Sequence, residues 1–134
     1  MTIKTIGYGL KKIDEFVDKL KENKIKVLVD VRTRPFSRWN PKYSRAPLET
    51  ELAKHNIKYI FKGNNLGGLG VNIDFETTVD EVVKLSSIVG LVVMCTETDY
   101  KKCHRFTVLT PAFEAKGVKV EHILWEKNNN PRLL

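Results

Sequence analysis

The sequence has few cysteines and no long apolar segment. Only two of its 134 residues are cysteine, whereas a small secreted domain is normally held together by several disulfides. No apolar run approaches the roughly 18 residues that a membrane-spanning helix needs, and the first residues lack the charged-then-apolar order of a secretory signal. We therefore expect a cytoplasmic protein, neither a disulfide-rich secreted scaffold nor a membrane protein.

The length and composition are typical of one globular domain. Hydrophobic residues make up 42% of the chain and charged residues 29%, which is far from the composition of a disordered chain. A chain of this length has no room for a second core of ordinary size. We predict a single domain over residues 1–127 and a flexible polar tail over residues 128–134.

The charge is strongly positive for so short a chain. There are 23 Lys and Arg residues against 16 Asp and Glu residues, which gives a formal net charge of +7. This balance favours an anionic partner, either a small phosphorylated molecule or a nucleic acid. The alternative is that the lysines bind no partner and only form a solvated surface, as in proteins stabilised by networks of surface charges. The sequence leaves the oligomeric state open.

Apolar segments of strand length alternate with amphipathic segments of helical spacing. The expected strands cover residues 3–9, 26–31, 58–61, 91–95 and 119–124. The expected helices lie near residues 13–20, 48–55, 78–85 and 103–116. We expect Thr78 to cap the third helix and the last helix to restart near Pro111. This alternation predicts a three-layer α/β/α domain of Rossmann-like type with a mostly parallel sheet.

Nearly all residues capable of chemistry follow one of these strands. Because the carboxyl ends of parallel strands meet at one edge of a sheet, we expect their side chains to gather there. The candidates for catalysis are Asp30, Cys95, Glu97 and Cys103. The candidates for substrate binding are Tyr8, Arg32, Ser37, Arg38, Gly67, Gly68, His104 and Arg105.

Four arginines lie in the expected loop over residues 32–47, interleaved with aromatic residues. They are Arg32, Arg34, Arg38 and Arg45, and the rings are those of Phe36, Trp39 and Tyr43. A guanidinium group presents a planar set of donors that suits phosphate, and a nearby ring can stack on a base. The alternative is that one or two of these arginines hold the loop to an acidic neighbour such as Asp30.

Cys103, His104 and Arg105 stand at the expected start of the last helix. Unpaired backbone amides at such a position attract anions and lower the pKa of a cysteine. Cys95 could face the same cavity, and Glu97 could transfer a proton or orient an arginine. The alternatives are that each cysteine is a buried packing residue, and that Arg105 forms an ion pair with Glu97 or Asp30. A reducing cytosol disfavours a disulfide between the two cysteines.

A metal site and a phosphate-binding glycine loop are both weakly indicated. Cys95, Cys103, His104 and His122 are side chains that zinc accepts, but they lack a Cys-x-x-Cys pair. The adjacent arginine would also oppose a cation, so we predict no metal and no cofactor. The glycine loop over residues 66–70 fits neither the P-loop nor the dinucleotide fingerprint. We expect it to form a turn that lines the site.

Three motifs resemble a known family. They are the sequence Asp30-Val31-Arg32-x-x-Pro35-x-Ser37-Arg38, then Leu66-Gly67-Gly68, then Cys95-x-Glu97 followed by Cys103-His104-Arg105. In this order they are similar to the family named domain of unknown function 488, and the similarity runs from Thr5 to Ile123. The resemblance implies a small cytosolic α/β protein of the kind found in bacteria and archaea, without a settled activity. Two departures are Gly9, where the family often has serine, and Leu69, where it often has arginine.

These observations favour an enzyme that acts on a phosphate-bearing substrate, such as a nucleotide or a nucleic-acid component. Arg32, Arg38 and Arg105 would hold the anion. Glu97 or Asp30 would transfer protons, and either cysteine would be the nucleophile of a covalent step. Hydrolysis or group transfer fits better than redox chemistry, because the dinucleotide fingerprint is missing. The alternatives are a nucleic-acid-binding module without catalysis and a domain that senses a small anion.

Overall fold

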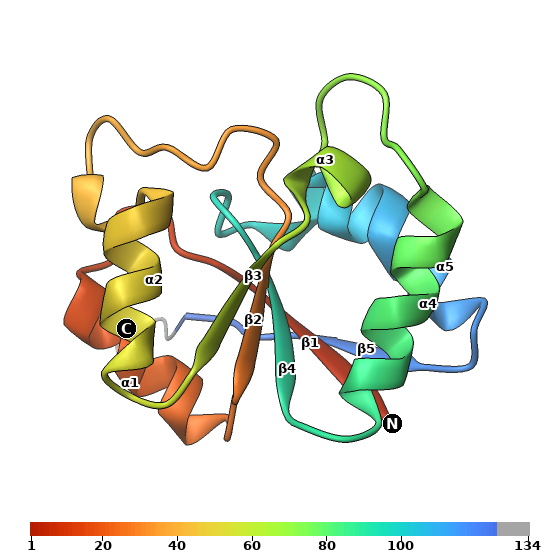
Figure 1. Cartoon of the computed structure of the whole chain (residues 1–134), viewed down its shortest axis with the longest axis horizontal. Coiled ribbons are helices and arrows are strands. Elements are labelled where there is room, and N and C mark those ends of the chain that lie inside the picture. The colour runs from red at the N-terminus through yellow and green to blue at the C-terminus, as the bar shows by residue number, and fades with distance from the viewer. Residues whose placement is uncertain (126–134) are drawn as a thin grey trace, which may run out of the picture.

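A central sheet of parallel strands organises the computed structural model, which describes residues 1–125 (Figure 1). The strands are β1 (Thr2–Gly7), β2 (Val27–Asp30), β3 (Lys58–Phe61), β4 (Leu91–Cys95) and β5 (Lys119–His122). Their order across the sheet is β3-β2-β4-β1-β5, and every neighbouring pair is parallel. The predicted α/β class is confirmed. The tail predicted over residues 128–134 lies outside the described residues.

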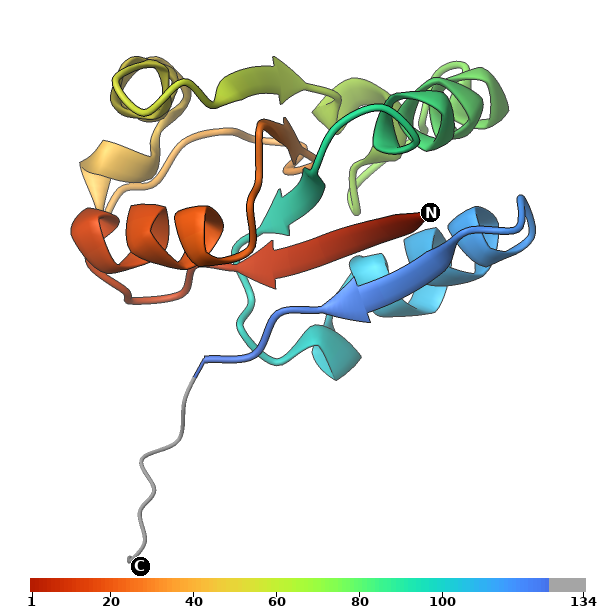
Figure 2. The same ribbon diagram turned by 90° about the horizontal axis from the view of Figure 1, so that it is seen from below.

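Helices cover both faces of this sheet, as the view from below also shows (Figure 2). One face is covered by α1 (Ile13–Glu22) and α2 (Arg45–Ala53), and the other by α3 (Gly63–Leu66), α4 (Phe75–Ser86) and α5 (Thr110–Glu114). This is the three-layer arrangement that the sequence predicts. None of the helices within residues 1–125 combines the length and the apolar character needed to cross a bilayer.

The two inner strands explain why the sheet forms here. Every residue of β2 and of β4 is buried, as expected for apolar strands covered on both faces, and β2 ends in the one charged residue of the two strands, Asp30. Successive side chains point to opposite faces. Leu28 belongs to the core cluster on the α1 and α2 side, whereas Val29 and Cys95 belong to the cluster on the α4 and α5 side.

Helix α1 shows how the local sequence determines an element. Ile13, Phe16, Val17 and Leu20 form its buried face, at the spacing of a helix packed on a sheet. Acidic residues occupy its first turn and lysines its last turn, which matches the helix dipole. The backbone amide of Lys12 donates to the carboxylate of Glu15 in this first turn, and this hydrogen bond caps the start of the helix.

Two local predictions need correction. Thr78 does not cap the third helix, because α4 begins at Phe75 and the Thr78 hydroxyl donates to the carbonyl of Asp74 within its first turn. Cys103 is not helical: it has an extended backbone between the 3-10 turn η2 (Tyr100–Lys102) and the π-helical turn η3 (Arg105–Leu109).

The carboxyl ends of the inner strands are level with one another. Gly7 pairs with Cys95, and Asp30 pairs with Met94. The connection after β1 runs through α1 on one face of the sheet, whereas the connection after β4 runs through α5 on the other. A crevice is expected where neighbouring strands send their connections to opposite faces. In Figure 1 the loops that follow β2 and α3 both rise beyond this edge.

Candidate functional site

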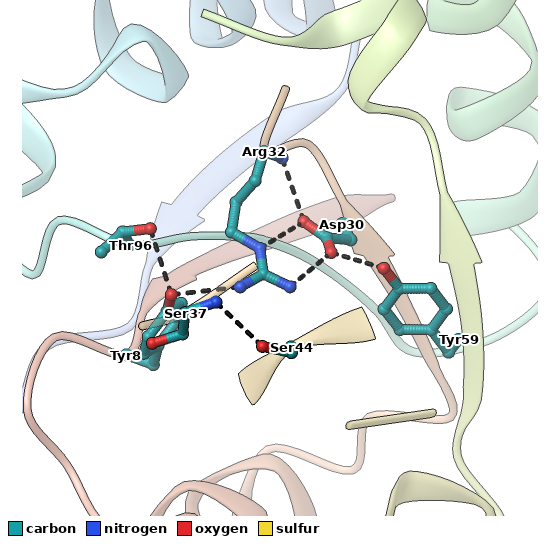
Figure 3. Close-up of polar contacts among 7 residues, drawn as sticks. All are labelled: Tyr8, Asp30, Arg32, Ser37, Ser44, Tyr59 and Thr96. Carbon is teal, nitrogen blue, oxygen red and sulfur yellow. Dashed lines mark hydrogen bonds and ion pairs between the residues drawn. The ribbon is translucent and has the colours of Figure 1, made fainter. Parts of the chain in front are cut away.

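Asp30 and Arg32 form a buried ion pair at the end of β2 (Figure 3). Two guanidinium nitrogens, Nε and Nη2, donate to the two carboxylate oxygens at 3.0 and 2.8 Å. The carboxylate also accepts hydrogen bonds from the Arg32 amide at 3.0 Å and from the Tyr59 hydroxyl at 2.5 Å. Every strong acceptor direction of Asp30 is therefore occupied from within the protein.

The third nitrogen of Arg32 extends this network to β1 and β4. Nη1 donates to the Tyr8 hydroxyl at 3.1 Å, and that hydroxyl also accepts from Thr96 at 3.3 Å. Burial opposes the charge of Arg32, but hydrogen bonding to Asp30 and the charge of that carboxylate outweigh it, so the pKa of the guanidinium lies above its ordinary value. Burial and the hydrogen bond to Asp30 likewise raise the pKa of Tyr59.

An open pocket of about 360 Å³ lies beside this network, beyond the carboxyl ends of β2 and β4. Six predicted site residues line it: Arg32, Gly68, Cys95, Glu97, Cys103 and His104. The other lining residues are Val31, Thr33, Arg34, Leu69, Thr96 and Lys102. The edge of the sheet thus brings together both cysteines and a guanidinium from separate loops, as the strand-end pattern predicts.

The two cysteines, which both line this pocket, are in contact with each other. Their sulfur atoms are 2.9 Å apart and are not bonded covalently. Cys95 is 4% exposed at the end of β4, and Cys103 is 8% exposed in the loop before η3. At this separation the two sulfurs share a proton in a hydrogen bond.

This hydrogen bond separates the acidities of the two thiols. The hydrogen bond from Cys95 lowers the pKa of the Cys103 thiol against the effect of burial, with help from His104 and from the backbone amide of Arg105. The same hydrogen bond, together with burial, raises the pKa of Cys95. These two directions favour a thiolate on Cys103, with the shared proton held by Cys95.

Arg105 is the cation that faces this charge. It is 1% exposed, and its Nη1 lies 2.6 Å from the Cys95 sulfur and 2.6 Å from the carbonyl oxygen of Glu97. Its Nη2 donates to the carbonyl of Thr98 at 3.2 Å. The alternative of an ion pair with Glu97 or Asp30 is wrong, because among the described residues no carboxylate lies within ion-pair distance of Arg105. Within the same residues its Nε has no hydrogen-bond partner.

His104 is oriented toward the thiolate. Its Nε2 lies 2.9 Å from the carbonyl of Leu66 and must donate, because a carbonyl only accepts. The other ring nitrogen, Nδ1, lies 3.7 Å from the Cys103 sulfur. The Cys103 sulfur, the His104 imidazole and the Leu66 carbonyl therefore lie next to one another in the order of a nucleophile, its base and the group that orients the base.

Two glycines allow this close packing. A Cβ atom on Gly7 would lie 1.8 Å from the carbonyl oxygen of Glu97 and 2.6 Å from Nη1 of Arg105. A Cβ atom on Gly68 would lie 3.0 Å from Nδ1 of His104. Gly7 thus lets the loop after β4 approach β1, and Gly68 lets the glycine loop approach the imidazole.

The remaining predicted site residues lie outside the pocket lining. Asp30 and Tyr8 belong to the buried network of Figure 3. The same view shows Ser37, whose amide donates to the Ser44 hydroxyl at 2.9 Å in a separate, half-buried contact. Arg38 is exposed and lies over the Trp39 ring, with its Cζ 5.9 Å from the ring centroid. Gly67 is packed against Thr33, and Arg105 contacts the sulfur of Cys95, which does line the pocket.

Some lining residues do not appear among the predicted site residues. Lys102 and Thr33 flank predicted residues in the sequence, so proximity along the chain is the signal that would find them. Tyr59 is the unforeseen partner of Asp30, and only the order of β3 beside β2 reveals that pairing. Within residues 1–125 no group of three His, Cys, Asp or Glu side chains is placed to hold a metal ion.

Comparison with known proteins finds a family match over part of the chain and no function. No curated protein and no solved structure matches the chain significantly. The matching family model covers the arginine loop and the glycine loop, but neither cysteine. Residues 12–70 match the family described as Domain of unknown function DUF488, which confirms over this segment the resemblance that the motifs predict.

Proposed function

We propose that the protein is a hydrolase or group transferase that acts on a phosphate-bearing substrate through the thiolate of Cys103. The observation that supports this most directly is the position of Cys103 in a pocket that Arg34 and Lys102 also line. Guanidinium and ammonium groups bind phosphate oxygens, and a thiolate next to them is a strong nucleophile.

The groups around Cys103 would keep it reactive at neutral pH. Cys95 donates a hydrogen bond to the thiolate, and Nδ1 of His104 faces it from the other side. A lowered thiol pKa increases the fraction of nucleophile at neutral pH. Arg105 lies behind the pair and offsets its negative charge.

The reaction would proceed in two balanced steps. In the first, the Cys103 sulfur forms a bond to phosphorus while the bond from phosphorus to the leaving oxygen breaks. The carboxyl group of Glu97, which lines the same pocket, gives that oxygen a proton. In the second, water attacks the phosphorus, the sulfur–phosphorus bond breaks, and Glu97 recovers the proton. In a transferase, another acceptor would take the place of water.

The loop beside the pocket favours a nucleotide or a nucleic-acid component as the substrate. Arg34 lines the pocket, and the aromatic rings that follow it, Phe36 and Trp39, are 70% and 87% exposed. Exposed rings next to cations suit the stacking of a base whose phosphate is held nearby. The same feature also supports the alternative of a nucleic-acid-binding module.

A binding and turnover screen would test the proposal. Thermal shifts and release of inorganic phosphate would be measured with mononucleotides, sugar phosphates and short oligonucleotides at two salt concentrations. We expect one phosphate class to raise the melting temperature by mass action and to be turned over by the wild type. Cys103→Ser should retain that binding and lose turnover.

The neighbouring lysines provide a matched control. Lys102→Ala should weaken binding, whereas Lys101→Ala should not, because both side chains are exposed but only Lys102 lines the pocket. Salt-sensitive binding of oligonucleotides that is unchanged in Cys103→Ser, without turnover of any compound, would contradict the enzyme and favour the binding module. Tight binding of one small anion without turnover would instead favour a sensor domain.

A further inference from the structure

The proposed function uses only one of the two thiols as a nucleophile. The sulfur of Cys95 lies 2.9 Å from the sulfur of Cys103, and both residues line the pocket. A disulfide bond is about 2.05 Å long, so the sulfurs need to approach by roughly 0.9 Å to become bonded. The loop between β4 and η3 holds the two sulfurs 2.9 Å apart.

We propose that Cys95 and Cys103 form a reversible disulfide after a peroxide oxidises Cys103, with Cys95 as the thiol that closes the bond. This modification is separate from the proposed phosphate chemistry, and its detection needs no substrate. The proposal gives Cys95 a chemical role in addition to its packing in the core.

The surroundings of the two sulfurs assign the order of events. Cys103 is the more exposed of the two and has Nδ1 of His104 3.7 Å from its sulfur. Its pKa is lowered, so it is the thiol that is present as the reactive thiolate. Cys95 keeps its proton and lies deeper, between Cys103 and Arg105. Peroxide entering the pocket would therefore meet Cys103 first.

Both chemical steps balance. The Cys103 thiolate attacks one peroxide oxygen, so that a sulfur–oxygen bond forms, the oxygen–oxygen bond breaks, and the second oxygen leaves as an alcohol or as water after taking up a proton. Cys95 then attacks the sulfenic acid of Cys103. The disulfide forms, the sulfur–oxygen bond breaks, and water leaves with the proton of Cys95. The two thiols supply the two electrons that reduce the peroxide.

Arg105 makes the disulfide easy to reopen. Oxidation removes the negative charge that the thiol pair presents to this guanidinium, which is 1% exposed and otherwise bonded to the carbonyls of Glu97 and Thr98. A buried cation without a counter-charge is unfavourable, so the protein favours the reduced pair. A dithiol reductant would regenerate it by thiol–disulfide exchange.

Mass spectrometry of the full chain would test the proposal. Reduced protein would be exposed to equimolar hydrogen peroxide, then denatured and alkylated without reductant. We expect the wild type to lose the mass of two hydrogen atoms and both alkylation sites, and to regain both after dithiothreitol. Peptide mapping should find Cys95 linked to Cys103 in the same chain. Two free thiols after this treatment, or links only between chains, would overturn the proposal.

Single variants assign the roles. Cys95→Ser should stop at a sulfenic acid on Cys103 that dimedone traps. Cys103→Ser should leave Cys95 oxidised at least about tenfold more slowly than Cys103 is in the wild type. Equal rates would contradict the assignment of Cys103 as the thiol that is attacked first. If a variant does not fold by circular dichroism, dimedone competition in the wild type should still label Cys103 and not Cys95, and the reverse labelling would overturn the order.

Discussion

Nη1 of Arg105 lies 2.6 Å from the sulfur of Cys95, in a region where no carboxylate among the described residues pairs with that guanidinium. A buried arginine is normally matched by an acidic side chain. Here the guanidinium instead contacts the sulfur of Cys95, which is hydrogen-bonded to Cys103, and the lowered pKa of Cys103 favours a negative charge on this thiol pair. The cation and the thiol pair therefore depend on each other, and changing one should be measurable in the other.

The variant Arg105→Lys tests this dependence. Lysine keeps the positive charge but presents one ammonium group in place of the planar fork that reaches Cys95, Glu97 and Thr98. We expect the free energy of unfolding to fall by about 2 to 4 kcal/mol, measured by denaturant titration. The pKa of the Cys103 thiol should rise toward its ordinary value.

The exposed residue Arg38 supplies the control for this experiment. Its side chain lies over the Trp39 ring, outside the pocket lining. Arg38→Lys should change the free energy of unfolding by no more than about 0.5 kcal/mol. An equally small change in Arg105→Lys would show that the contacts of Arg105 contribute nothing specific.

The acidity of Cys103 should appear in the pH dependence of alkylation. The hydrogen bond from Cys95 lowers the pKa of Cys103 from an ordinary value of 9.0, so reaction with iodoacetamide should continue well below pH 9.0 in the wild type. Cys95→Ala removes the donor, and the midpoint of the rate profile should move upward. Identical midpoints in the two proteins would contradict the assigned direction of proton sharing.

The same shift affects stability. Because the pKa of Cys103 is lower in the folded than in the unfolded chain, its thiolate adds to the free energy of unfolding as pH rises toward 9.0, and this contribution is lost as pH falls. The raised pKa of Cys95 acts in the opposite direction above pH 9.0. Urea titrations below that pH should show a slope of stability against pH that is smaller in Cys103→Ser.

Asp30→Asn tests whether the carboxylate holds Arg32. The substitution leaves a buried guanidinium without its counter-charge and replaces Oδ2, which accepts from Arg32 and Tyr59, by an amide nitrogen that donates. We expect a loss of about 3 to 5 kcal/mol in the free energy of unfolding. Asp18→Asn, at an exposed position of α1, should lie within about 0.5 kcal/mol of the wild type. Near-neutral stability of Asp30→Asn would mean that the ion pair makes no net contribution to the fold.

Gly7→Ala and Gly117→Ala separate crowding from backbone strain. At Gly7 a Cβ atom would overlap the carbonyl of Glu97, so the loop after β4 must shift, at a cost of at least about 2 kcal/mol. At Gly117 the φ angle is +84° and no heavy atom lies within 4 Å of the Cβ position. Its cost is the left-handed backbone alone, about 1 kcal/mol. Equal melting temperatures for the two variants would contradict the close packing at Gly7.

The fold could be predicted from the sequence further than the site could. β3 and β4 have the bounds that their apolar runs predict, and the restart near Pro111 coincides with the beginning of α5 at Thr110. These features depend on local composition. The order of the strands depends on which faces pack together, and this information is distributed over the whole chain.

The site was harder to predict because its side chains have more than one chemical use. An arginine in a basic loop looks like an anion ligand, yet Arg32 is committed to Asp30 and Arg105 to the cysteine sulfur and two carbonyls. The notion that an arginine of this loop is held by Asp30 is confirmed for Arg32. The burial of Arg32 and Arg105 results from the order of the strands and the packing of the loops, which no short sequence motif encodes.

The position of β4 in the sheet has a consequence for the assembly of the chain. β1 and β2 are close in sequence but are not neighbours, because β4 lies between them and pairs Lys4 with Val92 and Val27 with Leu91. Contacts between such distant residues form slowly, since a long loop must close first. A nascent chain that has not yet reached β4 holds two strands with an empty place between them, so the pocket and its thiols would be completed only after most of the protein has been synthesised.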